Sequence, residues 1–248
     1  MPFPLQDAAL AALILLFAFF IRGIAGFGSG LIAVPLLALF LPLTYVVPAI
    51  LLLDLVASIR LGGIGRQHVH WGEVRSLLPP TLIGVVLGTT VLVSAPKAPI
   101  LTLLGGYIIL AGLRSLLMHL DHGRHLSHWW AVPTGLVGGT ISGLFGTGGP
   151  PYVIYITHRL RDKARIRATV SAIFTLEGLT RLVAGLLAGL LSDPLLWWSL
   201  AAGLPILYLG LRLGERVHLH LSNEAMERLI GALLVGAGGA VLMKAAAV

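Results

Sequence analysis

The sequence predicts an all-α polytopic membrane protein built from two homologous halves, and three observations lead to this prediction. Hydrophobic residues make up 57% of the 248 residues and charged residues only 11%, with a mean hydropathy of +0.95. Soluble domains carry about a quarter charged residues. Several apolar segments approach the roughly 20 residues that a helix needs to cross the hydrocarbon core. Finally, the stretch "FGSG" at 27–30 returns as "FGTG" at 145–148.

The apolar segments give the expected order of elements. In chain order they are residues 5–22 with 31–41, 43–59, 76–94, 98–118, 129–142 with 152–158, 168–191, 194–211 and 228–244. Pro48 and Pro205 lie inside segments, which membrane helices tolerate when neighbouring groups satisfy the freed carbonyl. No segment alternates with period two, so an outer-membrane barrel is not expected.

Glycine interrupts the first and the fifth of these segments. The first runs over 5–41 around "GIAGFGSG", and the fifth over 129–158 around "GLFGTGGPP". Glycine weakens a helix interior and readily takes left-handed backbone conformations. Non-helical backbone at membrane depth survives only where protein buries it or where it lines a cavity. The sequence therefore predicts a buried helix break in each of these two segments.

Further matches show that the chain is an internal duplication. The stretch "AILLLDL" at 49–55 pairs with "AIFTLEG" at 172–178, which sets Asp54 opposite Glu177. The remaining matches pair Gly84 and Gly88 with Gly210 and Gly214, and Gly105 and Gly112 with Gly231 and Gly238. We therefore divide the chain into a first half, 1–120, and a second half, 121–248, which together form one membrane domain. Each half has one glycine-broken, possibly re-entrant, segment followed by three transmembrane helices.

Broken segments at corresponding places of two repeats indicate the binding site of a transporter. A helix that begins inside the membrane presents unpaired N–H groups and a positive dipole end, both of which suit an anion. We expect a small anionic substrate between the two breaks, near the membrane midplane. The residues expected to contact it are Arg22, Gly26, Phe27, Gly28, Ser29, Gly30, Phe145, Gly146, Thr147, Gly148, Gly149 and Arg181.

The charged residues inside the apolar segments each allow two interpretations. Arg22 either faces the substrate or extends its side chain to the membrane surface. Arg181 lies four residues after Glu177 on the same helix face, so it can contact substrate or form an internal ion pair, and the two roles are compatible. Asp54 and Glu177 are expected coupling residues, since a buried carboxylate suits proton carriage. Their alternatives are solvation at a helix end for Asp54 and the Arg181 pair for Glu177.

A metal or cation permease is the alternative function. It would use acidic residues and the clustered histidines His119, His122, His125 and His128, with His68, His70, His218 and His220 elsewhere. A solvated connection explains these histidines better, because the first cluster is charged and contains glycine. The chain has no cysteine, which excludes thiolate metal sites. We expect no enzyme activity, no cofactor and no nucleic-acid partner.

Basic residues in the connections suggest an orientation. They concentrate in 60–75, 114–128, 159–167 and 212–228. If basic connections are cytoplasmic, the fifth segment enters and leaves on one side as a re-entrant hairpin with arms of about 14 and 7 residues, and the halves are inverted repeats. Eight crossings in two parallel repeats is the alternative. The oligomeric state, the coupling ion and the transport direction are left open.

Two stretches resemble a known family. "GFGSGLIAVPLLALFLPLTYVVPAILLLDLVAS" and "GLVGGTISGLFGTGGPPYVIYIT" are similar to the two signature stretches of the TauE/SafE family of sulfite and organosulfonate exporters. The resemblance implies a secondary transporter, an exporter of small sulfur-containing oxyanions, in a bacterial-type inner membrane. The chain departs from the usual pattern in "GGPPY" at 148–152 and in "FGSG", which leaves the substrate open.

Overall fold

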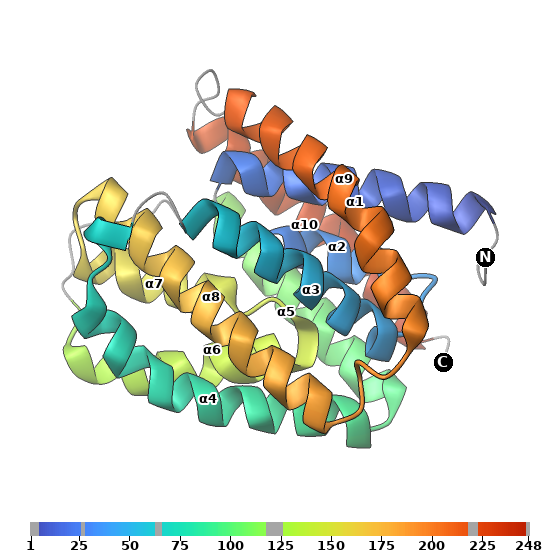
Figure 1. Ribbon diagram of the computed structural model, residues 1–248, viewed down its shortest axis with the longest axis horizontal. Helices are drawn as coiled ribbons and strands as arrows, with labels where there is room; N and C mark the ends of the chain where they lie inside the picture. Colours follow the sequence, from blue (N-terminus) through green and yellow to red (C-terminus); the bar gives the residue numbers. More distant parts are fainter. Residues whose placement is uncertain (1–4, 26–27, 63–65, 118–125, 218–222, 247–248) are drawn as a thin grey trace. The chain divides into compact units, whose positions relative to one another are not determined.

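The computed structural model describes residues 5–25, 28–62, 66–117, 126–217 and 223–246 (Figure 1). Every regular element in these ranges is helical, which confirms the all-α prediction. The elements are α1 (Leu5–Ala25), α2 (Ser29–Leu37), α3 (Leu43–Gly62), η1 (Arg66–His68), α4 (Trp71–Ser94), α5 (Lys97–Leu117), η2 (His128–Trp130), α6 (Ala131–Phe145), α7 (Gly149–Arg159), α8 (Lys163–Leu187), α9 (Pro194–Val217) and α10 (Asn223–Ala246).

Six of the described helices are long and apolar enough to cross a membrane: α1, α3, α4, α5, α8 and α9. In α10 the corresponding apolar stretch is shorter, Gly231–Ala246. Large apolar side chains such as Leu110, 68% exposed, and Leu187, 86% exposed, lie on the outer faces of these helices. Apolar side chains are stable there because the surrounding solvent is lipid. The chain is a multi-pass membrane protein.

The helices form two compact units, and each unit includes helices from the other half of the sequence: α9 and α10 belong to the first unit, and α4 belongs to the second. The first unit comprises residues 1–53, 95–118 and 193–248, and the second comprises 54–94 and 119–192. Within the first unit α9 packs along α1, and within the second unit α4 packs along α6. The division at residue 120 is therefore a property of the sequence repeat and not a boundary between compact units.

Glycines allow α9 and α4 to approach their partner helices closely. A Cβ on Gly210 of α9 would lie 2.8 Å from the carbonyl oxygen of Leu16 in α1, and one on Gly84 of α4 would overlap the carbonyl oxygen of Leu136 in α6. Gly88 and Gly214 are equally tight against α6 and α1. These four glycines are packing residues, since only glycine lets the two backbones come this close.

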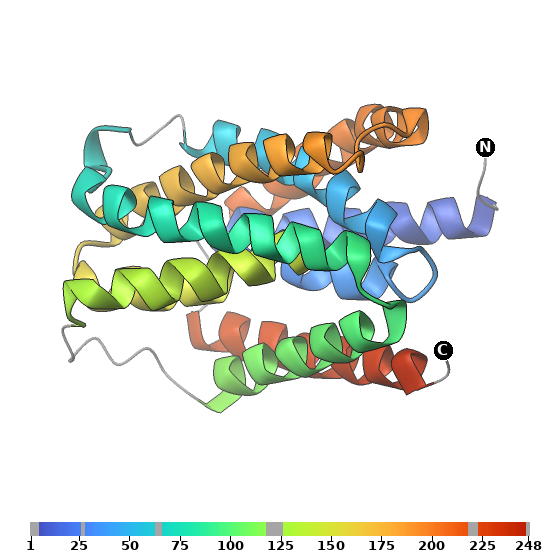
Figure 2. The same ribbon diagram turned by 90° about the horizontal axis from the view of Figure 1, so that it is seen from below.

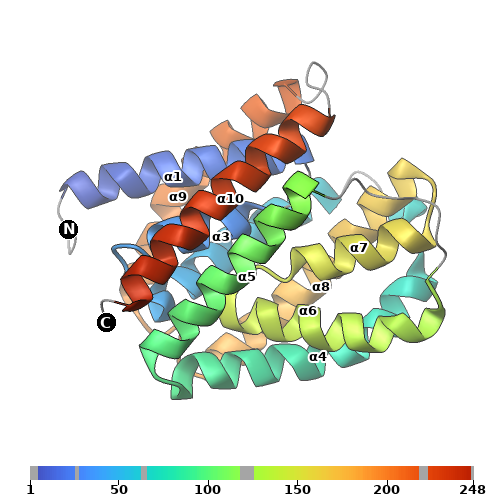
Figure 3. The same ribbon diagram turned by 180° about the vertical axis from the view of Figure 1, so that it is seen from behind.

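The equivalent helices α5 and α10 pack against each other in reciprocal fashion (Figures 2 and 3). A Cβ on Gly105 would lie 3.0 Å from the oxygen of Gly238, and one on Gly238 would lie 2.9 Å from the oxygen of Gly105. Gly112 and Gly231 make the same exchange, at 2.8 and 2.9 Å. The early residue of one helix thus meets the late residue of the other, so the pair is antiparallel.

The second broken segment folds back on itself. At the open end of the α6–α7 pair, Nη1 of Arg159 donates to the carbonyl oxygen of Leu126 at 3.1 Å, so the segment leaves beside the point where it enters. This agrees with the expected re-entrant hairpin, although its arms are 15 and 11 residues long. The pair α1–α2 is also in contact, but α2 has only 9 residues and α1 has 21, so α2 is less than half as long as α1.

Substituting a packing glycine is expected to destabilise the protein. Gly84→Ala and Gly210→Ala should each cost about 1–3 kcal/mol, because the added methyl groups have no space between two backbones. Gly106→Ala and Gly236→Ala are matched controls, since a Cβ at either position meets nothing within 4 Å. Alanine there should be neutral or slightly stabilising. Thermal unfolding of the purified variants measures the difference, and equal melting temperatures for the two pairs would contradict the packing role.

Candidate functional site

The first glycine break joins α1 to α2. Gly28 has φ of 95°, in the left-handed region that favours glycine, and α2 begins at the next residue, Ser29. Ser29 is fully buried, and its hydroxyl accepts a hydrogen bond from Nη1 of Arg22 at 2.8 Å. Arg22 is only 4% exposed. Its side chain therefore bridges the break, and the alternative in which it extends to the membrane surface is wrong.

The second break joins α6 to α7 and also contains a glycine with left-handed backbone conformation. Gly146 ends α6 with φ of 72°, and its N–H bonds to the carbonyl oxygen of Ser142 at 2.7 Å. Thr147 is 3% exposed, and Gly148 precedes the first residue of α7. Positive φ therefore occurs at the two positions that the sequence repeat pairs, Gly28 and Gly146.

A buried polar cluster lies against the second break. Nη1 of Arg181 is 3.8 Å from Oε1 of Glu177, one turn earlier on α8, and Ser142 donates to the same carboxylate oxygen. Glu177 is 3% exposed and Arg181 is 6% exposed. The ion pair expected from their spacing is confirmed. Ser142, which the sequence did not single out, brings α6 into the cluster.

One nitrogen of this cluster points at the break. A Cβ built on Gly146 would lie 2.8 Å from Nη2 of Arg181. This nitrogen is buried and makes no hydrogen bond within the described part of the chain. A buried guanidinium nitrogen with no acceptor is costly, so a ligand that supplies an oxygen at this point would be bound favourably. The cluster thus has the chemistry of an oxyanion site.

For the other expected site residues, the structure gives a position in a helix and a degree of burial. Gly30 is buried in α2, Phe145 is 3% exposed at the end of α6, and Gly149 begins α7. Asp54 lies half-buried on α3. Gly26 and Phe27 fall outside the described residues.

Several glycines of the two clusters serve packing instead of a break. The helix α1 continues through Gly23, where a Cβ would lie 2.6 Å from the oxygen of Leu211 in α9. Gly143 is equally tight against Val85 of α4, and Gly148 against Gly138 of α6. Gly23 and Gly143, which the sequence assigned to the interruptions, are therefore packing residues within continuous helices. The breaks themselves are short, because close helix packing uses the neighbouring glycines.

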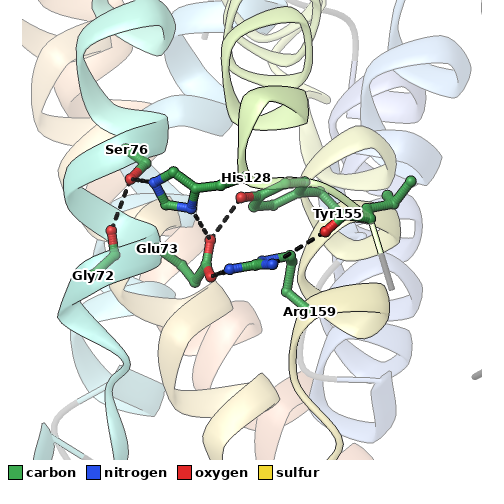
Figure 4. Close-up of polar contacts among 7 residues, drawn as sticks. Gly72, Glu73, Ser76, His128, Tyr155 and Arg159 are labelled. Carbon is green, nitrogen blue, oxygen red and sulfur yellow. Dashed lines mark hydrogen bonds and ion pairs between the residues drawn. The ribbon is translucent and has the colours of Figure 1, made fainter. Parts of the chain in front are cut away.

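A second buried polar cluster was not predicted (Figure 4). Glu73 of α4 is 2% exposed and accepts hydrogen bonds from Tyr155 Oη at 2.6 Å and Arg159 Nε at 2.8 Å, both in α7. Nη2 of Arg159 also lies 2.7 Å from Oε1 of Glu73. His128 approaches the carboxylate from η2, with Nδ1 at 3.7 Å, while its Nε2 bonds to Ser76 at 2.7 Å. We call Glu73, Tyr155 and Arg159 the clamp.

The clamp was missed because the apolar segment was expected to begin at residue 76, which assigned Glu73 to a connection. The helix α4 actually starts at Trp71, so Glu73 lies in its first turn. One sequence signal could have indicated the clamp: Glu73 is a lone acidic residue just before the apolar segment 76–94.

Within the described residues no group of three or more histidine, cysteine or acidic side chains is placed to hold a metal. His119, His122 and His125 lie outside these residues.

Comparison with known proteins gives a family and two relatives. The family model described as "Sulfite exporter TauE/SafE" matches residues 11–241. A Comamonas testosteroni protein named "Probable inner membrane transporter protein TsaS" is 31% identical over 190 residues, which cover 76% of this chain and 79% of the relative. A Cupriavidus necator protein named "Probable sulfite/organosulfonate exporter TauE" is 27% identical over 231 residues, covering 91% and 90%. No solved structure matches the chain.

Removing one partner of the Glu177–Arg181 pair should strongly destabilise the protein. Because a lone charge would remain buried, Glu177→Gln and Arg181→Met should each cost about 3–5 kcal/mol. The double variant should regain most of this loss, since it leaves neither charge. A double-mutant cycle in thermal or denaturant unfolding measures the coupling. Additive losses in the double variant would show that the two side chains do not interact.

Proposed function

Because the chain belongs to the TauE/SafE family, we propose that it is a secondary transporter that exports small sulfur-containing oxyanions, such as sulfite or organosulfonates. It is a protein of the inner membrane, and we propose that it acts as a transporter and not as an enzyme. The sulfur chemistry is inferred from the family description and from the printed name of the Cupriavidus necator relative.

The observation that carries the proposal is the unsatisfied guanidinium nitrogen of Arg181 beside the Gly146 break. Oxyanions of sulfur present several oxygens to the planar donor fork of arginine, which binds them more specifically than an ammonium group does. A cation permease would place acceptor oxygens at such a point instead. The missing Cβ at Gly146 leaves space directly next to the nitrogen.

The backbone adds donors to this charge. The first turn of α7 begins just after the break, and the first N–H groups of a helix have no partner within the helix. Pro150 and Pro151 have no N–H, so the donors without a partner in this helix are those of Gly148, its N-cap, and Gly149. Together with the dipole of α7 they favour a negative ligand.

We propose the same role for the first turn of α2, where Arg22 and Ser29 replace the charge and hydroxyl of Arg181 and Thr147. We propose that the remaining residues expected from the sequence serve the break to which each belongs: Gly26, Phe27 and Gly30 the first, and Phe145, Gly148 and Gly149 the second.

We further propose that Glu177, with its equivalent Asp54, couples anion movement to a proton. Glu177 shares Arg181 with the site, so protonating Glu177 would leave the full charge of Arg181 available to the anion. Proton and anion binding would then favour each other, as linkage requires. In Glu177→Gln we expect binding at equilibrium but no gradient-driven accumulation in proteoliposomes. Normal accumulation would exclude the proton role.

Sulfur oxyanions should bind to the purified protein, and the shape of Arg181 should matter. Sulfite and sulfoacetate are expected to raise the melting temperature, whereas acetate at the same concentration is not. Arg181→Lys keeps the charge but loses the planar fork. It should weaken sulfite binding at least tenfold, about 1.4 kcal/mol.

Arg75→Lys is the matched control, because Arg75 is exposed on α4. It should leave the affinity unchanged. Stabilisation by divalent metal ions with no response to any sulfur oxyanion would contradict the proposed function.

Alanine at the two breaks should impair binding by different routes. Gly28→Ala adds a methyl group in open space, so its cost is the left-handed backbone, roughly 1–2 kcal/mol. Gly146→Ala carries the same cost and also pushes against Nη2 of Arg181, so it should lose more sulfite affinity. Ser29→Ala and Thr147→Ala each remove one neutral hydrogen-bonding group and should lose about 1 kcal/mol or less. Isothermal titration measures this order. Normal affinity in Gly146→Ala would place the site elsewhere.

A further inference from the structure

The repeat extends to the two helices that start beside the clamp and its counterpart. With the spacing that pairs Gly84 with Gly210, Trp71 also pairs with Trp197 and Pro79 with Pro205. These matches are independent of the glycines, and they fix the alignment at the start of α4 and α9. Glu73 of the clamp is therefore equivalent to Ser199.

The other two clamp residues, Tyr155 and Arg159, have apolar counterparts. Counted from the matched stretches "FGSG" and "FGTG", Tyr155 is equivalent to Leu37 and Arg159 to Leu41. The first half thus has leucine, leucine and serine where the second half has tyrosine, arginine and glutamate. None of these first-half residues carries a charge, so this half cannot form the ion pair.

The first-half counterparts line a cavity. It has a volume of about 240 Å³ and lies among α1, α2, α3 and α9 in the first unit. Leu37, Leu41 and Ser199 all face it, with Tyr45 and Asp7 as further polar lining residues. Ser199 shares a hydrogen bond with Tyr45 of α3 at 2.5 Å, whereas its equivalent Glu73 bonds to α7.

In the second half the corresponding place is filled and bridged. Tyr155 is 1% exposed and packs in an apolar cluster with Tyr152 and Ile173. Ile173 is equivalent to the cavity residue Ile50. The contacts from Glu73 to Tyr155 and Arg159 tie α4 to α7 across this place. The same architecture is thus open in one repeat and closed in the other.

We propose that Glu73, Tyr155 and Arg159 form a releasable latch that closes, in the second half, a vestibule whose counterpart stands open in the first half. The proposal rests on the proposed transport function, since a vestibule serves a substrate that moves. In the second half polar side chains bridge this place, and in the first half their counterparts line a cavity.

The surroundings of the latch suit a gate. Trp71, Trp129 and Trp130, between 49% and 82% exposed, flank the clamp on α4 and η2. Tryptophan is enriched where membrane meets water, so the clamp lies at the level where a vestibule would open. Arg159 is 27% exposed along its side chain, so water reaches one partner of the pair. Trp197 and Trp198 hold the equivalent place beside Ser199.

Cysteine labelling tests the latch, because the chain has no cysteine of its own. Ala49 lines the first-half cavity, and its equivalent Ala172 packs against the apolar cluster of the second half. Both alanines are half-buried. Ala49→Cys should react faster than Ala172→Cys with a charged, membrane-impermeant thiol reagent, because a thiol must meet water to ionise and react, and it is Ala49 that lines the described cavity. The exposed position Gln67→Cys provides the reference rate in every background.

Exchanging the latch residues between the repeats provides matched variants. Glu73→Ser, Tyr155→Leu and Arg159→Leu together give the second half the residues of the first. Because no lone charge is left buried, this triple variant avoids the main cause of misfolding. Labelling of Ala172→Cys should rise at least tenfold. An unchanged labelling rate in a monodisperse triple variant would show that the clamp only fastens α4 to α7.

The reverse exchange tests the same idea without touching the clamp. Leu37→Tyr, Leu41→Arg and Ser199→Glu together should build a second latch and lower the labelling of Ala49→Cys at least tenfold. If this triple variant folds and Ala49→Cys remains fully reactive, the three residues do not make a latch. If the second-half triple variant fails to fold, the labelling of Ala49→Cys in the first-half triple variant still tests the latch.

Labelling does not depend on any substrate, so the two proposals fail separately. If the latch exchange changes labelling but no sulfur oxyanion binds, the latch stands and the proposed function falls. If sulfite is transported normally by the second-half variant and labelling of Ala172→Cys does not rise, the function stands and the latch falls.

Discussion

The constraint on which the rest of this structure depends is that a helix ending inside an apolar environment must have its free backbone groups covered by protein. Gly28 and Gly146 stop two helices by turning the backbone into the left-handed region. Each break is flanked by a buried arginine, Arg22 or Arg181. The arginines come from different helices, α1 and α8, so the repeat conserves the break in the backbone while the charge beside it has two origins.

Close glycine packing is what makes this covering possible. Gly23 and Gly143 lie only a few residues from the breaks, yet they let α9 and α4 press directly on the helices that end there. These two helices pack against the broken segments from outside. A single glycine-rich stretch therefore contains two kinds of glycine, one that lets neighbouring backbones meet and one that bends its own backbone.

The elements that depend on local pattern could be predicted from the sequence, and those that depend on long-range pairing could not. The order of the helices, the positive φ at the paired glycines and the Glu177–Arg181 contact follow from hydropathy, repetition and helical spacing. The roles of Ser142 and of the clamp do not, because Glu73 meets Tyr155 and Arg159 only after some eighty residues of intervening chain have folded. Gly23 also looked like part of a break, since its partner α9 lies in the other half of the sequence.

The reciprocal contact between α5 and α10 has a consequence for how such a chain can arise. Gly105 meets Gly238 while Gly112 meets Gly231, so position i contacts j and j contacts i. This is the pattern of an isologous interface in a two-fold symmetric dimer. A half-length ancestor that inserted in both orientations would pair with itself through this one helix, and gene fusion would then leave its homodimer interface inside a single polypeptide.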